Sequence, residues 1–325
     1  PQIVRMSSTI SSRAPLRVAL LGFGLAGRAF HAPFIASTPG LTLAAVVTSD
    51  AERGAEVRRA HPAARVLPSA DALWADPAQA DVVVVATPNR SHVPLARAAL
   101  AAGLATVIDK PMALDAASAA TLVRDFAAAG VPLTTYQNRR WDGAARTARA
   151  LLADGALGRV HRIEARIERW RPQPRGGWRE RSEPEEGGGL LYDLGPHLVD
   201  WALTLAGPAT HVYAEVDARR PGVAVDDDVF VAITHASGVR SHLWASALAG
   251  QRGASLRVLG DRAAYVKFGV DPQEPALRDG DANPARPGWG EEPEAAWGTL
   301  GADDDDVRPV RTLPGQWGLF YAALE

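Results

Sequence analysis

The chain has 325 residues, enough for two domains, and a net charge of −2 that gives no electrostatic reason to expect nucleic acid or anionic membrane as a partner. Cysteine is absent, which excludes disulfides, thiolate nucleophiles and cysteine-bound metal, and we expect no metal site. No apolar run reaches the roughly 18 residues of a membrane-spanning helix. We therefore expect a cytoplasmic protein with a polar, disordered leader at residues 1–15.

The first structured stretch is 16–30, where a buried-strand run is followed by glycines at 22, 24 and 27 and then by apolar residues at helical spacing. This order of strand, glycine turn and helix is typical of dinucleotide-binding folds. The first glycine permits the tight turn, the second lets a pyrophosphate approach the backbone, and the third lets helix and strand pack closely. The expected contacts are Gly22, Phe23, Gly24, Ala26 and Gly27.

A second buried strand at 42–47 ends in Thr48 and Ser49, where the ribose of a dinucleotide is read. A carboxylate at this point would favour NAD, whereas hydroxyls with a nearby arginine, here Arg53, can bind the 2′-phosphate of NADP. We expect NADP, with NAD as the alternative. In the competing interpretation, Thr48 and Ser49 only cap a helix and Arg53 lies on its solvated face.

Residues 81–86 read as a central parallel strand, and its carboxyl end should face the cofactor. Thr87, Pro88 and Asn89 are therefore candidate contacts, together with His92, which could equally be a surface histidine in the first turn of a helix. We include Asn138, in the polar cluster 136–142 after the expected last strand at 132–135, among the cofactor contacts.

Lysine occurs only at positions 110 and 267, among 35 basic residues. Lys110 follows a short strand at 105–108, on the edge of the sheet where ligands bind, and Pro111 restricts its backbone to an extended conformation. Because a titratable amine does what a guanidinium cannot, we expect Lys110 to contact the cofactor and the substrate, with Pro111 beside it. The competing interpretation is a surface lysine before a helix.

The pattern of apolar residues changes after residue 136, from continuous buried runs to alternation. We place there the boundary between a dinucleotide-binding domain (16–136) and a second domain (137–325). Strict alternation there predicts strands at 163–168, 212–216, 229–234, 239–246, 256–259 and 263–266, and a long irregular loop at 271–306. The predicted fold is α/β, with a doubly wound Rossmann domain followed by an α+β domain with a mostly antiparallel open sheet. One uncovered face of that sheet predicts a homodimer or homotetramer.

Asp193 and His197 are four residues apart, so on one helix the carboxylate would orient and charge-stabilise the imidazole. Pro196 complicates this, since it can mark the true start of a helix. A structural Asp–His pair is the competing interpretation.

Several motifs together resemble the glucose-fructose oxidoreductase, inositol dehydrogenase and MocA-like (Gfo/Idh/MocA) family. They are GFGLAGRAFHAP (22–33), ATPNRSH (86–92), DKP (109–111), YQNRRWD (136–142), GGGLLYDLGPHLVDW (187–201) and the ending GQWGLFYAALE. QNRRWD and WGEEP (289–293) look most like the branch of NADP-dependent scyllo-inositol dehydrogenases. The resemblance implies that Lys110 stands by the nicotinamide, with Asp193 and His197 as the acid–base pair. Many relatives carry Glu where this chain has Asp109, and relatives continue past the point where this sequence stops.

These observations predict hydride transfer between a nicotinamide and a secondary alcohol or ketone of a polyol, inositol or sugar. The alternative is a non-catalytic protein of the same fold that binds dinucleotide and sugar, which would need no proton donor. A polar ligand with aromatic walls is suggested by a further set of expected substrate contacts, namely Arg140, Trp141, Trp178, Arg179 and Tyr192. The sequence does not name the substrate.

Overall fold

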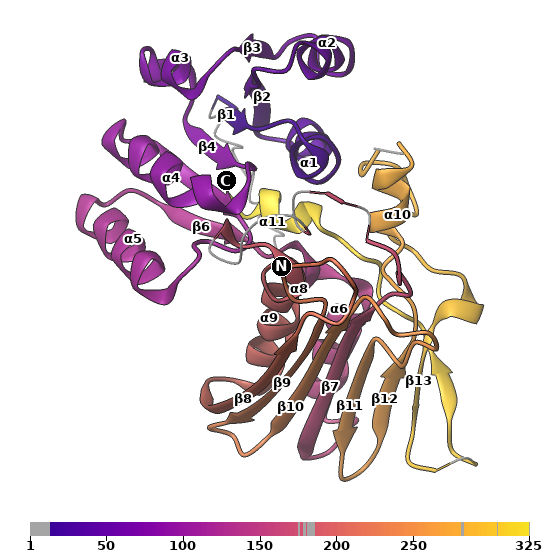
Figure 1. The fold of residues 1–325 in the computed structure, drawn as a ribbon. Helices are drawn as coiled ribbons and strands as arrows, with labels where there is room; N and C mark the ends of the chain where they lie inside the picture. Colours follow the sequence, from indigo (N-terminus) through magenta and orange to yellow (C-terminus); the bar gives the residue numbers. More distant parts are fainter. Residues whose placement is uncertain are drawn as a thin grey trace, which may run out of the picture.

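The computed structural model describes residues 14–174, 176–177, 180, 186–280, 283–303 and 305–324. The remaining residues include most of the expected leader and two expected substrate contacts, Trp178 and Arg179, so those predictions lie outside the described residues. The chain forms two sheets, each with helices, which lie one above the other in Figure 1.

The first sheet has six parallel strands in the order β3-β2-β1-β4-β5-β6, the doubly wound order of a Rossmann fold. Its strands are β1 (Leu16–Leu21), β2 (Leu41–Val47), β3 (Arg65–Leu67), β4 (Val82–Val85), β5 (Ala105–Asp109) and β6 (Leu133–Tyr136). The helices between them are α1 (Ala32–Ser37), α2 (Ala51–Ala60), α3 (Ala70–Trp74), α4 (His92–Ala101) and α5 (Ala116–Ala129). The continuous apolar runs of the central strands form because both faces of a parallel sheet are covered. Five of the six strands are thus confirmed, and β3, only three residues long, was not predicted.

The second sheet has eight strands in the order β14-β13-β12-β11-β7-β10-β9-β8, antiparallel except where β7 and β10 pair. They are β7 (Val160–Glu168), β8 (Ala209–Asp217), β9 (Asp228–His235), β10 (Arg240–Ser246), β11 (Leu256–Gly260), β12 (Ala264–Lys267), β13 (Gly298–Gly301) and β14 (Arg308–Val310). The predicted open, mostly antiparallel sheet is confirmed. The expected loop at 271–306 is wrong in part, because it contains α10 (Gln273–Arg278) and β13.

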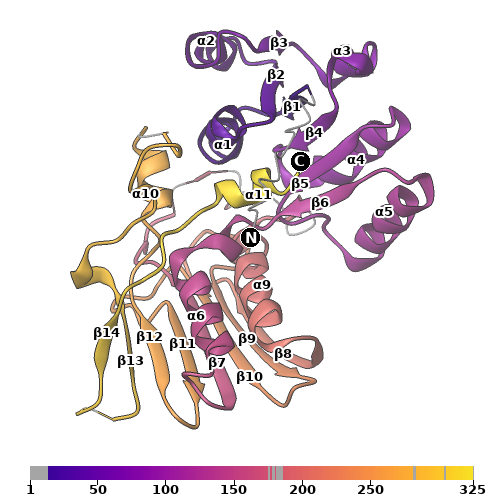
Figure 2. The same ribbon diagram turned by 180° about the vertical axis from the view of Figure 1, so that it is seen from behind.

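Two helices, α6 (Gly143–Ala153) and α9 (Gly195–Ala206), cover one face of this sheet, as Figure 2 shows. Their apolar sides and the inward residues of β7, β9, β10 and β11 form one core. The opposite face carries Tyr213, Phe230 and Trp244 in a row of ring contacts, and no described helix packs on it. On β8 at the sheet's edge, Val212 is 64% and Tyr213 60% exposed, so the alternation seen in the sequence does not bury this strand within one chain.

The end of the chain returns to the first domain. Helix α11 (Gly318–Ala322) lies between the two sheets in Figure 1, and Trp317, Phe320 and Tyr321 belong to the core of the Rossmann domain. The Tyr321 hydroxyl hydrogen-bonds to Nδ1 of His31, 290 residues earlier. Residues assigned by sequence to the second domain therefore complete the core of the first.

Candidate active site

The turn after β1 has the shape that a dinucleotide pyrophosphate requires. Gly22 has a φ of 95°, and a Cβ there would lie 2.6 Å from the carbonyl oxygen of Ala86. A Cβ on Gly27 would lie 2.1 Å from the carbonyl oxygen of Gly22, whereas a Cβ on Gly24 would meet nothing within 4 Å. Tight packing on both sides of an open position at Gly24 fits a bound dinucleotide.

Two other predicted contacts of this turn differ in position. Ala26 lines the cavity described below, but the ring of Phe23 is buried in the core against His61, with the ring centroids 6.3 Å apart. The side chain of Phe23 therefore belongs to the core and leaves only its backbone for a ligand.

The end of β2 carries both a cation and a carboxylate. Asp50, rather than Thr48 or Ser49, caps α2, because its Oδ1 accepts from the backbone N–H of Arg53 at 3.0 Å. Its other oxygen lies 3.5 Å from Nε of Arg53, whose side chain is about half exposed. The Thr48 hydroxyl accepts from the N–H of Asp50. Arg53, the arginine expected to bind a 2′-phosphate, is thus paired with the carboxylate of Asp50.

The loop after β4 is tied to its neighbours. Asn89 Nδ2 donates to the carbonyl oxygen of Gly187 at 2.9 Å, and the ring nitrogens of His92 lie 2.7 Å and 2.9 Å from the carbonyl oxygens of Pro111 and Thr87. His92 is 1% exposed, so it is not the surface histidine of the competing interpretation. Its ring joins the loops after β4 and β5, and its contact with a cofactor stays a prediction. Pro88 lies in the first of these loops.

Lys110 lies directly after β5, where the sequence placed it, and its ammonium is directed at Asp193. Nζ lies 2.6 Å from the carbonyl oxygen of Asp193 and 3.1 Å from its Oδ1. Both side chains are largely buried. On the other side, Asp109 accepts from the backbone N–H of Lys110, and His31 Nε2 lies 3.9 Å from Asp109. Burial alone would raise the pKa of Asp109, but His31 and Lys110 outweigh it and hold that pKa below its ordinary value.

Asp193 and His197 do not share one helix. Helix α8 (Gly189–Asp193) ends at the carboxylate, and α9 begins at Gly195 with Pro196 in its first turn. Proline is well accommodated there because the first N–H groups of a helix have no intrahelical partner. The helix start that Pro196 indicated in the sequence is therefore present, and Asp193 and His197, although on different helices, line one cavity.

His197 is buried, and its Nδ1 has no hydrogen-bond partner among the described residues. Burial lowers the pKa of His197 well below its ordinary value, and the charges of Lys110 and Arg139 lower it further, while Asp193 opposes them. Asp193 makes no hydrogen bond to Nδ1 of His197, and its charge does not outweigh the effect of burial on the pKa of the imidazole. Asp193 pairs with Lys110, and the imidazole is neutral at neutral pH.

These groups surround a cavity of about 250 Å³ between the two domains. Ala26 contributes from the glycine turn, Lys110 from the end of β5, and Asn138 from the turn after β6, while Asp193 and His197 form the opposite wall. The structure thus brings the expected catalytic residues together beside the expected cofactor turn. The described residues contain no group of three His, Asp or Glu side chains that could hold a metal ion.

Three expected substrate contacts lie elsewhere. Arg140 is paired with Asp200 on α9, and with Trp141 it lines a different cavity, beside β4, β5 and β6. Tyr192 donates its hydroxyl to the carbonyl oxygen of Leu114 and does not line the cavity of Lys110 and His197. The reason is the 3₁₀ turn at Asn138–Trp141, which directs Arg139 rather than Arg140 toward the site.

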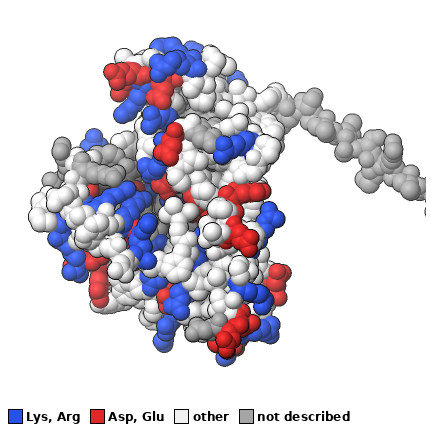
Figure 3. Space-filling model, turned by 90° about the vertical axis from the view of Figure 1, so that its right-hand side faces the viewer, with Lys and Arg blue, Asp and Glu red and all other residues white. Residues whose placement is uncertain are grey.

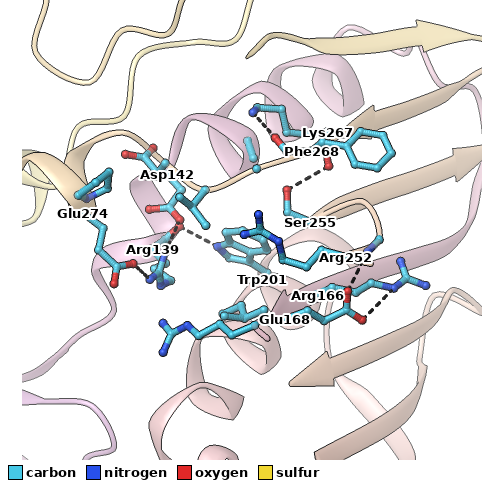
Figure 4. A pocket seen from close by; sticks show the side chains of 18 of the residues that line it. Arg139, Asp142, Arg166, Glu168, Trp201, Arg252, Ser255, Lys267, Phe268 and Glu274 are labelled. Carbon is cyan, nitrogen blue, oxygen red and sulfur yellow. Dashed lines mark hydrogen bonds and ion pairs between the residues drawn. The ribbon is translucent and has the colours of Figure 1, made fainter. Parts of the chain in front are cut away.

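Arg139 is a site residue that sequence reasoning missed. It is buried, lies 3.2 Å from Oδ2 of Asp142, and pairs with Glu274 on α10. Figure 4 shows the Arg139–Glu274 pair at one end of a second cavity of about 700 Å³, which shares part of its lining with the first. Burial would raise the pKa of Glu274, but Arg139 and Arg278 bring it down to about 2. The 135 residues between Arg139 and Glu274 left no local signal for this pair.

Comparison with known proteins agrees with this geometry. Residues 16–137 match the oxidoreductase family with an NAD-binding Rossmann fold, and residues 145–266 match the GFO/IDH/MocA C-terminal domain. The uncharacterized oxidoreductase YdgJ of Escherichia coli is 39% identical over 310 residues, covering 95% of this chain and 87% of YdgJ. The chain belongs to the Gfo/Idh/MocA family of oxidoreductases.

Other members of the family extend the comparison. The scyllo-inositol 2-dehydrogenase (NADP(+)) IolW of Bacillus subtilis is 30% identical, with 95% of this chain and 85% of IolW covered. The solved structure of YPO2259 from Yersinia pestis is 38% identical, with a TM-score of 0.86 over 96% of this chain and 86% of that one. An oxidoreductase from Agrobacterium radiobacter, in complex with NAD+, L-tartaric acid and magnesium, shares the fold at 20% identity and a TM-score of 0.72, covering 93% and 80%. Family membership makes the glycine turn an NAD(P) site. Among the described helices, none is long and apolar enough to cross a membrane.

Proposed function

We propose that this chain is an NADP-dependent dehydrogenase that interconverts a secondary alcohol and a ketone of a polyol, inositol or sugar. The observation that carries the proposal is the meeting of Lys110, Asp193 and His197 in one cavity beside the glycine turn. A protein that only bound dinucleotide and sugar would have no use for a buried ammonium next to a neutral imidazole.

The side chains divide the chemistry between them. A nicotinamide bound beside the glycine turn would supply the hydride acceptor for oxidation of the alcohol carbon and the hydride donor for reduction of the ketone. In oxidation the hydroxyl proton passes to His197, whose lowered pKa leaves the imidazole free to accept it. In reduction the same proton returns to the substrate oxygen. The Lys110 ammonium stabilises negative charge on that oxygen in both directions, and Asp193 holds the ammonium in place.

The preference for NADP rests on the end of β2. Thr48 and Ser49 stand where an NAD enzyme would carry a carboxylate, and the half-exposed Arg53 lies one turn into α2. A 2′-phosphate would draw Arg53 away from Asp50, and a dianion is the stronger partner for a guanidinium. The NADP dependence in the name of IolW supports the same preference.

We also propose that the uncovered face of the second sheet is an interface between copies of this chain. Tyr213, Phe230 and Trp244 form a row of aromatic side chains on this face without an internal partner among the described helices. A dimer or tetramer would cover it.

The test is a panel of inositols, sugars and their ketone forms, offered with NADP+ or NADPH and with NAD+ or NADH, while absorbance of the reduced nicotinamide is followed. At least one polyol should be oxidised, faster with NADP+ than with NAD+. Tight NADPH binding without turnover of any compound in either direction would favour the non-catalytic alternative.

A further inference from the structure

Arg169 follows β7 and reaches the wall of the catalytic cavity. Its backbone is fixed on both sides, because its N–H donates to Ser246 at 2.8 Å and its carbonyl oxygen accepts from Ala249 at 3.1 Å. The next residue, Trp170, bridges to Leu248. The side chain lines both the cavity of about 250 Å³ and the neighbouring one of about 700 Å³. A guanidinium is thus held by rigid backbone where the two cavities meet.

This guanidinium lacks the counter-ion that its neighbours have. Arg139 and Arg278 both pair with Glu274, and Lys110 pairs with Asp193. Within the described ranges, no carboxylate lies within 4.0 Å of the Arg169 side chain. Burial lowers the pKa of Arg169, and the more distant Glu274 and Asp193 do not compensate for it. A partly desolvated charge without a partner is unfavourable until an anion meets it.

Other basic side chains near the cavity also favour a negatively charged ligand. On the face drawn in Figure 3, Lys and Arg side chains gather beside the hollow between the two domains. The positive charges of Lys110, Arg139 and Arg169 all act on His197 and lower its pKa. An anion bound by Arg169 would offset part of this field and make the imidazole a better proton acceptor.

We propose that the substrate of this enzyme is a polyhydroxylated acid whose carboxylate is bound by Arg169 while its reacting carbon lies between Lys110 and His197. This inference rests on the proposed function and narrows its substrate class. A guanidinium offers two parallel N–H donors that match a carboxylate, and this pairing adds orientation as well as affinity. Arg169 is then a specificity residue rather than a member of the acid–base pair.

The experiment compares acids with their neutral counterparts. D-gluconate with D-glucitol and D-glucuronate with D-glucose are titrated calorimetrically into the NADP+-loaded protein, and turnover of each compound is measured in parallel. D-glucose 6-phosphate is included to separate a phosphate from a carboxylate. The variants are Arg169→Met and Arg169→Lys, and the matched control is Arg252→Met. Arg252 is an exposed arginine of the larger cavity, away from the Arg139–Glu274 pair in Figure 4.

At least one acid should bind more tightly than its neutral counterpart, and Arg169→Met should weaken its binding by about 10- to 100-fold while leaving the neutral compound unchanged. Arg169→Lys should restore only part of the affinity, since an ammonium lacks the paired donors. Arg252→Met should change neither. Because Arg169→Met removes a poorly compensated charge, its melting temperature should equal or exceed that of the parent protein.

The proposal is overturned if no acid is preferred, if the phosphate is preferred in its place, or if Arg252→Met weakens acid binding as much as Arg169→Met. It is also overturned if Arg169→Met weakens NADPH binding instead, because Arg169 would then belong to the cofactor site. Arg169-dependent acid binding without any turnover would refute the dehydrogenase and leave this site standing. Turnover of neutral polyols without preference for an acid would support the dehydrogenase and refute the carboxylate site at Arg169.

Discussion

Single alanine substitutions in the glycine turn should separate folding from cofactor binding. In Gly27→Ala, the new Cβ would lie 2.1 Å from the carbonyl oxygen of Gly22, so the helix and the turn must move apart. Overpacking of this kind costs about 1–3 kcal/mol. For a chain of this size each kcal/mol lowers the melting temperature by about 2–4 °C, so the cofactor-free variant should melt several degrees early.

Gly24→Ala is the matched variant, because its Cβ meets nothing within 4 Å and its backbone lacks the positive φ of Gly22. Its stability should match the parent protein or exceed it by up to about 1 kcal/mol, since alanine has less freedom in the unfolded chain. The methyl group would occupy the place of the pyrophosphate and disturb hydrogen bonds to a charged group. These are worth about 1.5–3 kcal/mol each, so NADPH affinity should fall at least about tenfold.

Both effects can be measured on the same preparations, by thermal unfolding without cofactor and by fluorescence titration with NADPH. If Gly24→Ala binds NADPH like the parent protein, the pyrophosphate does not lie at this turn. If Gly27→Ala has the same melting temperature as the parent protein, the close contact between helix and turn does not constrain the fold.

Five further expectations concern the site and the surface. Lys110→Ala should lower kcat/KM by about 10²- to 10⁴-fold in steady-state measurements. Lys110→Arg should not restore the rate, because the larger planar guanidinium cannot place its charge where the compact ammonium lies. His197→Asn should lower kcat by a similar factor with NADPH titration unchanged. The oxidation rate of the parent protein should stay constant as the pH falls to 6.5, because the neutral imidazole of His197 is lost only below its lowered pKa. A rate that already falls with decreasing pH above pH 6.5 would contradict this. Thr48→Asp should make NADH bind more tightly than NADPH, as measured by competitive titration of the two. A variant that still prefers NADPH would contradict this. Tyr213→Lys should shift light scattering toward the single-chain mass, whereas a parent protein that is already monomeric would remove the proposed interface.

The sequence predicted the Rossmann sheet well because each of its strands carries its own signal. β4 is a run of four valines between Asp81 and Ala86, and such a continuous β-branched run is typical of a buried parallel strand. The proposed catalytic residues were also recognisable from local sequence. Lys110 stood out in a chain that otherwise uses arginine, and the spacing of Asp193 and His197 placed them near one another even though Pro196 begins a new helix between them.

The features that the sequence did not reveal depend on contacts between residues far apart in the chain. Arg139 and Arg140 are adjacent and chemically identical, and only Glu274 on one side and Asp200 on the other distinguish the site residue from the structural one. Lys267, the other lysine, is buried against Glu292 at 3.2 Å, 25 residues further on, where no periodicity could reveal the pairing. Short strands such as β3 form because a neighbour offers hydrogen bonds, which composition does not record.

The return of the final helix to the first domain affects how the protein is made. A Rossmann domain emerging from the ribosome would already hold all of its strands, yet Trp317, Phe320 and Tyr321 would be missing from its core and His31 would lack its hydroxyl partner. Contacts across 290 residues close late, because the loop between them must be ordered first. Synthesis of the α11 segment, rather than completion of the sheet, is then the step that completes the core of the nascent domain, and until then the apolar surface of that core is accessible to chaperones.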